Sequence, residues 1–407
     1  MAVGPGIQET LLPISGVSIG VACAGIKKEN HRDLVVFEIA PGSSVGAVFT
    51  QNAFCAAPVH VAKANIASGQ ETRFLVINTG NANAGTGKQG IEDAQETCSR
   101  LAGKRSVNPE QVLPFSTGVI GEYLPMSSLI SGIPDALATL TTDNWTEAAT
   151  GIMTTDTREK GASRQFEFED ETITVTGISK GSGMIKPNMA TMLAFIATDA
   201  PVTQELMQKI TAIAAEKSFN RITVDSDTST NDACVAIATG KANVTRVEDE
   251  SNPLYGYLLK TVTEVMLSLA QQIIRDGEGA KKFISVQVNH SDNSENALKI
   301  AYAVAESPLF KTAMTASDAN WGRILMAVGK SGVAELDVDN IDVYLGDVQI
   351  VENGQRCKTY TEAAGAAVVA EEEILVRIEL NRGDVSETVW TSDLSYEYIK
   401  INAEYRS

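Results

Sequence analysis

The sequence predicts a mixed α/β fold with two lobes, and three observations lead to this prediction. Short apolar runs rich in β-branched residues alternate with segments of helical periodicity along the whole chain. The 407 residues, 43% of them hydrophobic, are enough to bury a large core divided between two lobes. The sequence has no internal repeat, low-complexity tract or long linker. We therefore expect the two lobes to be intimately packed.

The first half of the chain is predicted to contain two buried strands, a helix and a hairpin. The strands are residues 33–39 and 73–78, which are short and apolar, and the helix is residues 91–104. Residues 165–177 alternate apolar and polar side chains on both sides of Asp170-Glu171. This alternation predicts a hairpin that turns at these two residues.

The second half is predicted to begin with helices and to end in strands. Thr203 is expected to cap one helix, and residues 258–273 carry apolar side chains at helical spacing along a longer one. Such apolar stripes usually face a core. The last seventy residues are predicted to form strand hairpins, one over residues 341–351 and another over residues 374–390, turning at residues 381–384.

The charge balance excludes some classes of partner. Lys and Arg number 33 against 51 Asp and Glu, a formal net charge of −18. Such an acidic chain repels nucleic acid and anionic membrane surfaces, so neither is expected as a partner. The first residues have no signal-peptide pattern, and no window approaches 18 continuous apolar residues. These features predict a cytoplasmic enzyme of small metabolites.

Cysteine and histidine usage limits the chemistry. The five cysteines are odd in number and form no CxxC pair, which is typical of reduced, mostly buried thiols in a cytosolic protein. Only three histidines are present, and none stands near another His or Cys at metal-ligand spacing, so no metal site is expected. Acyl chemistry would need a base other than histidine. These residues are Cys23, Cys55, Cys98, Cys234, Cys357, His31, His60 and His290.

Residues 85–90 match the pattern G-x-G-x-x-G between a strand and a helix. In a dinucleotide site the glycines begin directly at the strand end, so that the helix N-terminus meets the pyrophosphate. Here residues 79–84 intervene and make the connection long and polar. A structural or substrate-lining loop is therefore favoured over a nucleotide site.

Residues 114–121 place Thr117 and Gly118 at the end of an apolar run. A small hydroxyl residue beside glycines can expose N–H groups in a tight turn, and each donor aimed at an oxyanion is worth about 3 kcal/mol in acyl transfer. The alternative is an ordinary turn before a helix at residues 125–138. The motif alone leaves both interpretations open.

Near the middle of the chain, a loop rich in Gly, Ser, Pro and Asn runs into an apolar, strand-like segment with Thr191 at the junction. Attack by the Thr191 hydroxyl on the Ala190 carbonyl would cut the chain. The new α-amine, with an unperturbed pKa near 8, would then serve the same hydroxyl as a base. On spacing alone, a flexible loop that enters a strand is the better interpretation.

Residues 180–193, KGSGMIKPNMATML, resemble the self-cleavage segment of the ornithine acetyltransferase (glutamate N-acetyltransferase) family of arginine biosynthesis. The resemblance extends in order over nearly the whole chain, which makes it highly specific. The other matching segments are residues 116–121, 153–157, 225–232, 276–279 and 317–323.

The resemblance implies an autoprocessing, N-terminal-nucleophile-like fold. Cleavage between Ala190 and Thr191 would give an α chain, residues 1–190, and a β chain, residues 191–407, that stay together. Thr191 would be the nucleophile, and Thr117 with Gly118 the oxyanion hole. The implied substrate-binding residues are Thr154, Lys180, Thr191, Glu278, Asn402 and Ser407. Ser407 stands where the family often has threonine, so the hydroxyl is kept.

The implied reaction moves the acetyl group of N-acetylornithine to glutamate in two steps, through an acetyl-threonine ester. The resemblance implies an α2β2 assembly and no metal or bound cofactor. It leaves open whether acetyl-CoA is a second acetyl donor. Lys180 is expected to pair with the substrate carboxylate and Glu278 with its distal ammonium. The alternatives are an amidase or aminopeptidase that passes the acyl group to water, and a protein that cleaves itself without being an enzyme.

Overall fold

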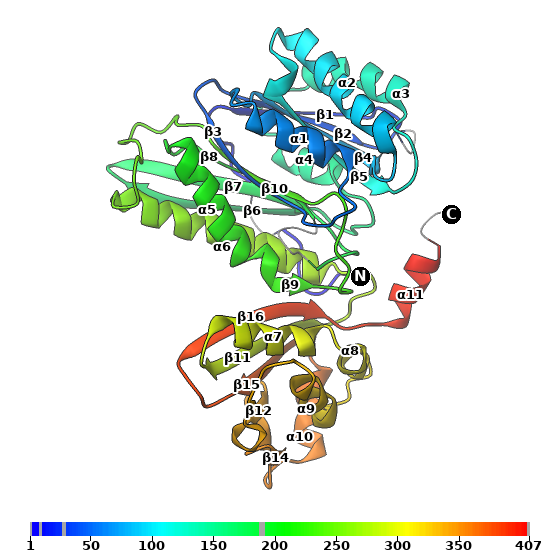
Figure 1. The fold of residues 1–407 in the computed structure, drawn as a ribbon, viewed down its shortest axis with the longest axis vertical. Helices are drawn as coiled ribbons and strands as arrows, with labels where there is room; N and C mark the ends of the chain where they lie inside the picture. The colour runs from blue at the N-terminus through cyan, green and yellow to red at the C-terminus, as the bar shows by residue number, and fades with distance from the viewer. Residues whose placement is uncertain (1, 8–9, 27–29, 187–191, 405–407) are drawn as a thin grey trace.

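The computed structural model describes residues 2–7, 10–26, 30–186 and 192–404, and its elements form two lobes (Figure 1). The larger lobe contains two sheets with helices outside them, and the smaller lobe is built on a third sheet. The predicted mixed α/β class is confirmed. None of the helices within these ranges is long and apolar enough to cross a membrane.

The two sheets of the larger lobe are formed by strands from many parts of the chain. The first has the order β1 (Val17–Ala22), β2 (Leu34–Ile39), β4 (Phe74–Asn81), β5 (Val112–Val119). The second has the order β3 (Ser44–Phe49), β10 (Ala233–Ala238), β8 (Leu193–Thr198), β7 (Glu171–Lys180), β6 (Lys160–Phe168). The predicted strands at residues 33–39 and 73–78 are confirmed as β2 and β4.

A buried apolar layer joins these two sheets. Phe195 of β8 lies at its centre, with ring centroids 5.5 Å from Phe37 of β2 and 5.2 Å from Phe115 of β5. Phe195 is fully buried, and the same cluster includes Val235 of β10. Aromatic contacts of this kind therefore hold the first sheet against the second.

Replacing Phe195 with alanine is expected to lower the free energy of unfolding by about 3–5 kcal/mol, because the surrounding sheets cannot close the cavity fully. Urea denaturation followed by circular dichroism would measure the change. Phe54→Ala is the matched control, since Phe54 is 64% exposed and its loss should cost less than about 0.5 kcal/mol. Equal effects in the two variants would contradict the central position of Phe195.

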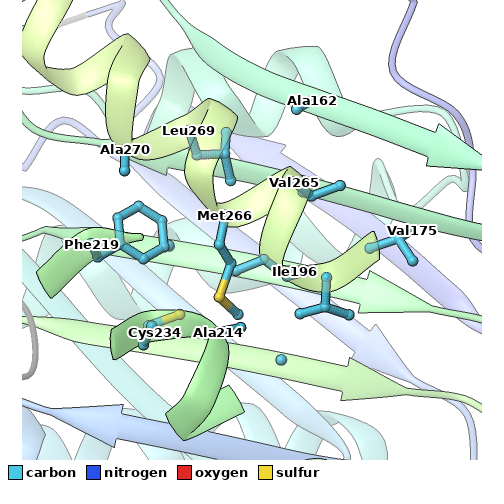
Figure 2. Close-up of a cluster of buried hydrophobic side chains, with 14 of the residues drawn as sticks. Ala162, Val175, Ile196, Ala214, Phe219, Cys234, Val265, Met266, Leu269 and Ala270 are labelled. Carbon is cyan, nitrogen blue, oxygen red and sulfur yellow. The ribbon is translucent and has the colours of Figure 1, made fainter. Parts of the chain in front are cut away.

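Helices cover the outer faces of both sheets. The first sheet carries α1 (Ala57–Ala67), α2 (Gly87–Arg105) and α3 (Met126–Ala138), while α4 (Trp145–Gly151) contacts strands of both sheets. The second sheet carries α5 (Gln204–Glu216) and α6 (Pro253–Arg275). Figure 2 shows side chains of α6, such as Met266 and Leu269, above Ile196 and Cys234 of this sheet. Thr203 caps α5, as predicted.

The smaller lobe is built on a seven-stranded sheet. Its strand order is β14 (Gln355–Arg356), β13 (Val348–Glu352), β12 (Asp342–Leu345), β15 (Glu373–Glu379), β11 (Phe283–Ser291), β16 (Val385–Ser392), β9 (Ile222–Thr223). Its helices are α7 (Ser294–Ala305), α8 (Pro308–Thr315), α9 (Trp321–Gly329) and α10 (Glu362–Ala370). Strand β9 follows α5 of the larger lobe and pairs with β16, so the lobes are closely packed.

The predicted hairpin at residues 165–177 is correct, but its turn is one residue earlier than expected. Phe168 pairs with Glu171, which leaves Glu169 and Asp170 as the two turn residues. Both have positive φ, 48° and 63°. A two-residue hairpin favours this conformation because it matches the twist of the strands.

The prediction for the last seventy residues was partly wrong. β12 and β13 form the expected hairpin, but β15 and β16 do not pair, because β11 lies between them, parallel to β15 and antiparallel to β16. β11 carries the fully buried Val286 and Val288, and a strand with such buried side chains is typical of a position with neighbouring strands on both sides. The helices α10 and α11 (Tyr396–Ala403) were also missed.

Candidate active site

A cavity of about 240 Å³ lies among the ends of β5 and β7, the turn after α6 and helix α11. The structure brings six of the predicted site residues into its wall: Thr117, Gly118, Thr154, Lys180, Glu278 and Asn402. Ala190, Thr191 and Ser407 lie outside the described residues. Met192 and Leu193, which follow Thr191 in the chain, line the same cavity.

Thr117 and Gly118 lie where the parallel pairing of β4 and β5 becomes irregular. The register shifts between Gly80 and Asn81, opposite these residues, which is typical of a β-bulge. Gly118 has φ +136°, and a Cβ there would lie 2.3 Å from the carbonyl carbon of Gly80. Only glycine fits at this position, so the bulge and the glycine together shape this wall of the cavity.

Lys180 ends β7 and faces Thr117. Its Nζ donates a hydrogen bond of 3.0 Å to the Thr117 hydroxyl oxygen. Burial lowers the pKa of Lys180 most strongly, and the carboxylates of Asp156 and Asp232 oppose that shift. The ammonium is therefore desolvated and depends on nearby acidic groups to stay charged.

Glu278 and Asn402 form the opposite side of the cavity. The Asn402 Nδ2 donates to Glu278 Oε2 at 2.7 Å, although the two residues are 124 positions apart. A Cβ on Gly183 would lie 2.4 Å from the Glu278 carboxyl carbon, so the loop after β7 touches this carboxylate closely. Asn402 belongs to α11, so this helix brings the end of the described chain to the cavity wall.

Asp225 holds the segment that leads toward the predicted cut. Its carboxylate accepts backbone N–H bonds from Met184 at 2.6 Å and Ile185 at 2.8 Å. It also accepts a bond of 3.1 Å from the Tyr398 hydroxyl of α11. One carboxylate therefore joins the loop after β7 to the C-terminal helix.

The glycine-rich segment at residues 85–90 is held by the side chains of Asn83 and Thr86. Asn83 donates to the Gly90 carbonyl at 2.9 Å, and Thr86 donates to Asn83 at 2.8 Å. A Cβ on Gly90 would lie 1.9 Å from the Thr86 hydroxyl oxygen. The close contact with Thr86 explains why glycine is needed at position 90. Of the preceding residues 79–84, Ala82 lines the cavity.

Three buried charged residues next to the cavity wall were not selected from the sequence. Lys160 lies between Asp156 and Asp276, with its Nζ 2.6 Å from a carboxylate oxygen of each. The signal in the sequence that could have pointed to them was their position, since Asp156 and Asp276 fall within two of the segments that match the family. Asn231, another residue not selected, donates to the carbonyls of Ala82 and Ser116 beside the cavity.

Within the described ranges, no group of three or more His, Cys, Asp or Glu side chains could hold a metal ion. The five cysteines are all free, and burial raises the pKa of Cys98 to about 12. A buried thiol with such a pKa is not a reactive nucleophile. Among the described residues no cysteine lines the cavity, so its hydroxyl, ammonium and carboxylate groups are the candidates for its chemistry.

Comparison with known proteins gives a consistent match. The model of the ArgJ family matches residues 18–407. Two proteins named "Arginine biosynthesis bifunctional protein ArgJ", from Pseudomonas fluorescens (strain Pf0-1) and Pseudomonas syringae pv. tomato (strain ATCC BAA-871 / DC3000), are each 56% identical over 407 residues, the whole of both chains. A crystal structure with that protein name, from Bacillus halodurans, is 36% identical with a TM-score of 0.50. It covers 52% of this chain and 99% of its own.

Proposed function

Because this chain belongs to the ArgJ family, we propose that it transfers the acetyl group of N-acetylornithine to glutamate through an acetyl ester on Thr191. The observation that carries this proposal is the cavity, which gathers Thr117, Gly118, Lys180 and Glu278 from three separate segments. The full-length relatives named for arginine biosynthesis agree with these substrates.

We further propose that the chain cuts itself between Ala190 and Thr191 into residues 1–190 and 191–407. Leu193, two residues after Thr191, pairs with Lys180, and Met192 lines the cavity, so the chain next to the cut adjoins the proposed oxyanion hole. The matched Bacillus halodurans chain is about half as long as this one, as a cleaved product would be.

In the first half-reaction, the Thr191 hydroxyl oxygen attacks the acetyl carbonyl carbon, and its proton passes to the α-amine of Thr191. Thr117 and the Gly118 N–H donate to the resulting oxyanion. The carbon–nitrogen bond then breaks, and the α-amine returns the proton to the leaving nitrogen of ornithine. The product is an acetyl ester of Thr191 and free ornithine.

In the second half-reaction, the neutral amine of glutamate attacks the ester carbonyl. The new oxyanion uses the same two donors, and the proton lost by the amine returns to the Thr191 oxygen as the ester bond breaks. N-acetylglutamate leaves, and Thr191 regains its hydroxyl. One site thus serves both substrates in turn, without a metal or bound cofactor.

The experiment that tests this function is a half-reaction followed by a chase. Acetyl-labelled N-acetylornithine alone should leave the label on the peptide that begins with Thr191, as seen by mass spectrometry. Adding glutamate should move the label to N-acetylglutamate. Release of labelled acetate instead would favour the amidase or aminopeptidase alternative, and cleavage without any acetyl-threonine would favour a self-cleaving protein that is not an enzyme.

Replacing Glu278 with glutamine is expected to raise the KM for N-acetylornithine by about tenfold or more, because the distal ammonium loses its charged partner. The kcat should change little. Steady-state kinetics with N-acetylnorvaline, which lacks that ammonium, supplies the control: the variant should no longer prefer N-acetylornithine. An unchanged KM would remove Glu278 from this role.

Acetyl-CoA is our proposed second acetyl donor, for which the support is the word "bifunctional" in the names of the two full-length relatives. Acylation of Thr191 by the thioester would give the same acetyl ester and release CoA. Formation of N-acetylglutamate from acetyl-CoA and glutamate, with N-acetylornithine absent, would support this activity. If glutamate is acetylated from N-acetylornithine but not from acetyl-CoA, the enzyme has one donor.

We also propose a cytoplasmic location and an α2β2 assembly. The five free cysteines agree with a reducing compartment. Native mass spectrometry of the purified protein would give the assembly directly, and cell fractionation would give the compartment.

A further inference from the structure

Three buried charged side chains lie next to the cavity wall without forming part of it. Asp156, Lys160 and Asp276 have side chains 0%, 1% and 1% exposed. Lys160 bridges the two carboxylates, with 2.6 Å to each. Burying three charges is costly unless each is paired and hydrogen-bonded, so a cluster of this kind calls for a reason beyond packing.

The two carboxylates belong to segments that also supply the cavity, and the lysine pairs with a third such segment. Asp156 closely follows Thr154, and Asp276 precedes Glu278 by two positions. Lys160 pairs across the sheet with Ser179, the neighbour of Lys180. The cluster thus ties three separate parts of the site together at one point.

Hydrogen bonds that the two carboxylates accept fix the backbone close to cavity residues. Asp156 accepts the N–H of Thr154 at 3.0 Å and the N–H of Gly181 at 2.7 Å. Asp276 accepts the Thr157 N–H at 3.0 Å and also the Thr157 hydroxyl. A shift of either carboxylate would therefore move the segment that carries Lys180 or the one that carries Glu278.

The charge of Lys180 depends on the same cluster. Asp156, Asp232 and Glu278 favour its ammonium form, while Lys160 and burial oppose it. The ammonium donates to the Thr117 hydroxyl oxygen, and a hydroxyl that accepts such a bond has its own proton free for another acceptor. A charged Lys180 thereby prepares Thr117 to donate to an oxyanion in the cavity.

We propose that Asp156, Lys160 and Asp276 are positioning residues for acetyl transfer. Asp156 positions Lys180 next to Thr117 and favours its charged form. Asp276 positions Glu278, and Lys160 bridges the two carboxylates. None of the three touches the substrate. This inference rests on the acetyl-transfer function proposed above.

The test compares Asp156→Asn with Asp276→Asn, because each removes one of the two carboxylates that face Lys160. Rates are expressed per cleaved chain. Asp156→Asn should lower kcat about tenfold and move the alkaline limb of the pH profile to lower pH. Without that carboxylate the pKa of Lys180 falls further, and the ammonium is lost earlier as pH rises. Asp276→Asn should instead raise the KM for N-acetylornithine and leave the alkaline limb in place.

A purely structural cluster predicts a different result. Both variants would then lose stability in thermal melts, while the cleaved, folded fraction kept the wild-type kcat, KM and alkaline limb, and this outcome would overturn the proposal. An inactive wild-type protein would instead count against acetyl transfer itself. If Asp156→Asn does not fold, Asp156→Glu takes its place, because it keeps the charge. This variant should retain the alkaline limb of the pH profile but lower kcat. A wild-type kcat in Asp156→Glu would also overturn the proposal.

Discussion

Replacing Thr191 with alanine is expected to leave the chain as one uncut polypeptide and to reduce acetyl transfer by more than about 10⁴-fold. In the proposed mechanism both processes need the same hydroxyl, which attacks the Ala190 carbonyl once and accepts the acetyl group in every later turnover. The uncut chain also lacks the α-amine that takes the hydroxyl proton. Loss of the hydroxyl thus removes nucleophile and base together.

Denaturing electrophoresis and intact mass would measure the cleavage, and N-acetylglutamate formation would measure the activity. Thr191→Ser is the matched control, because it keeps a hydroxyl and should still be cut and active, at reduced rates. An alanine variant that is cleaved and active would overturn both the cut site and the mechanism.

Replacing Thr117 with valine is expected to lower kcat by about 10²–10³-fold, the usual cost of losing one oxyanion donor. Valine keeps the shape of threonine, and Thr117 is 7% exposed, so the strand should stay in place. The KM should change little, because the donor acts on a charge that develops only in the transition state. Self-cleavage should slow as well, since it passes through a similar oxyanion.

Thr117→Ser is the control for this variant, because it keeps the hydroxyl that accepts from Lys180. It should retain most of the activity. Steady-state kinetics of cleaved protein, together with the time course of cleavage, would measure both effects. A valine variant with wild-type kcat would leave Thr117 as part of an ordinary strand end.

Local patterns in the sequence predicted much of the fold. The apolar runs at β2 and β4, the cap of α5 at Thr203 and the hairpin of β12 and β13 depend on neighbouring residues, and all were correct. The insertion of β11 between β15 and β16 depends on a strand more than eighty residues away from its partners. Periodicity within one segment carries no information about such pairing.

The candidate site likewise contains residues that the sequence pointed to and contacts that only the folded chain shows. The resemblance pointed to Glu278 and Asn402, but residue type and spacing alone would describe both as ordinary polar positions. Their contact joins α11 to the turn after α6, a link that only the folded chain reveals. Lys160 follows Arg158 and Glu159 in a stretch that looks like a solvated surface, yet its side chain is 1% exposed. Its role became visible only with both carboxylates in place.

The strand order of the second sheet also determines what a cut at residue 190 would mean. Strands β3, β6 and β7 come before that bond and β8 and β10 after it, and β10 is hydrogen-bonded to both β3 and β8. The two products would be interleaved within one sheet and one core. Cleavage would be a nick in a finished domain, so pulling the fragments apart would amount to unfolding it, and neither fragment is expected to refold without the other.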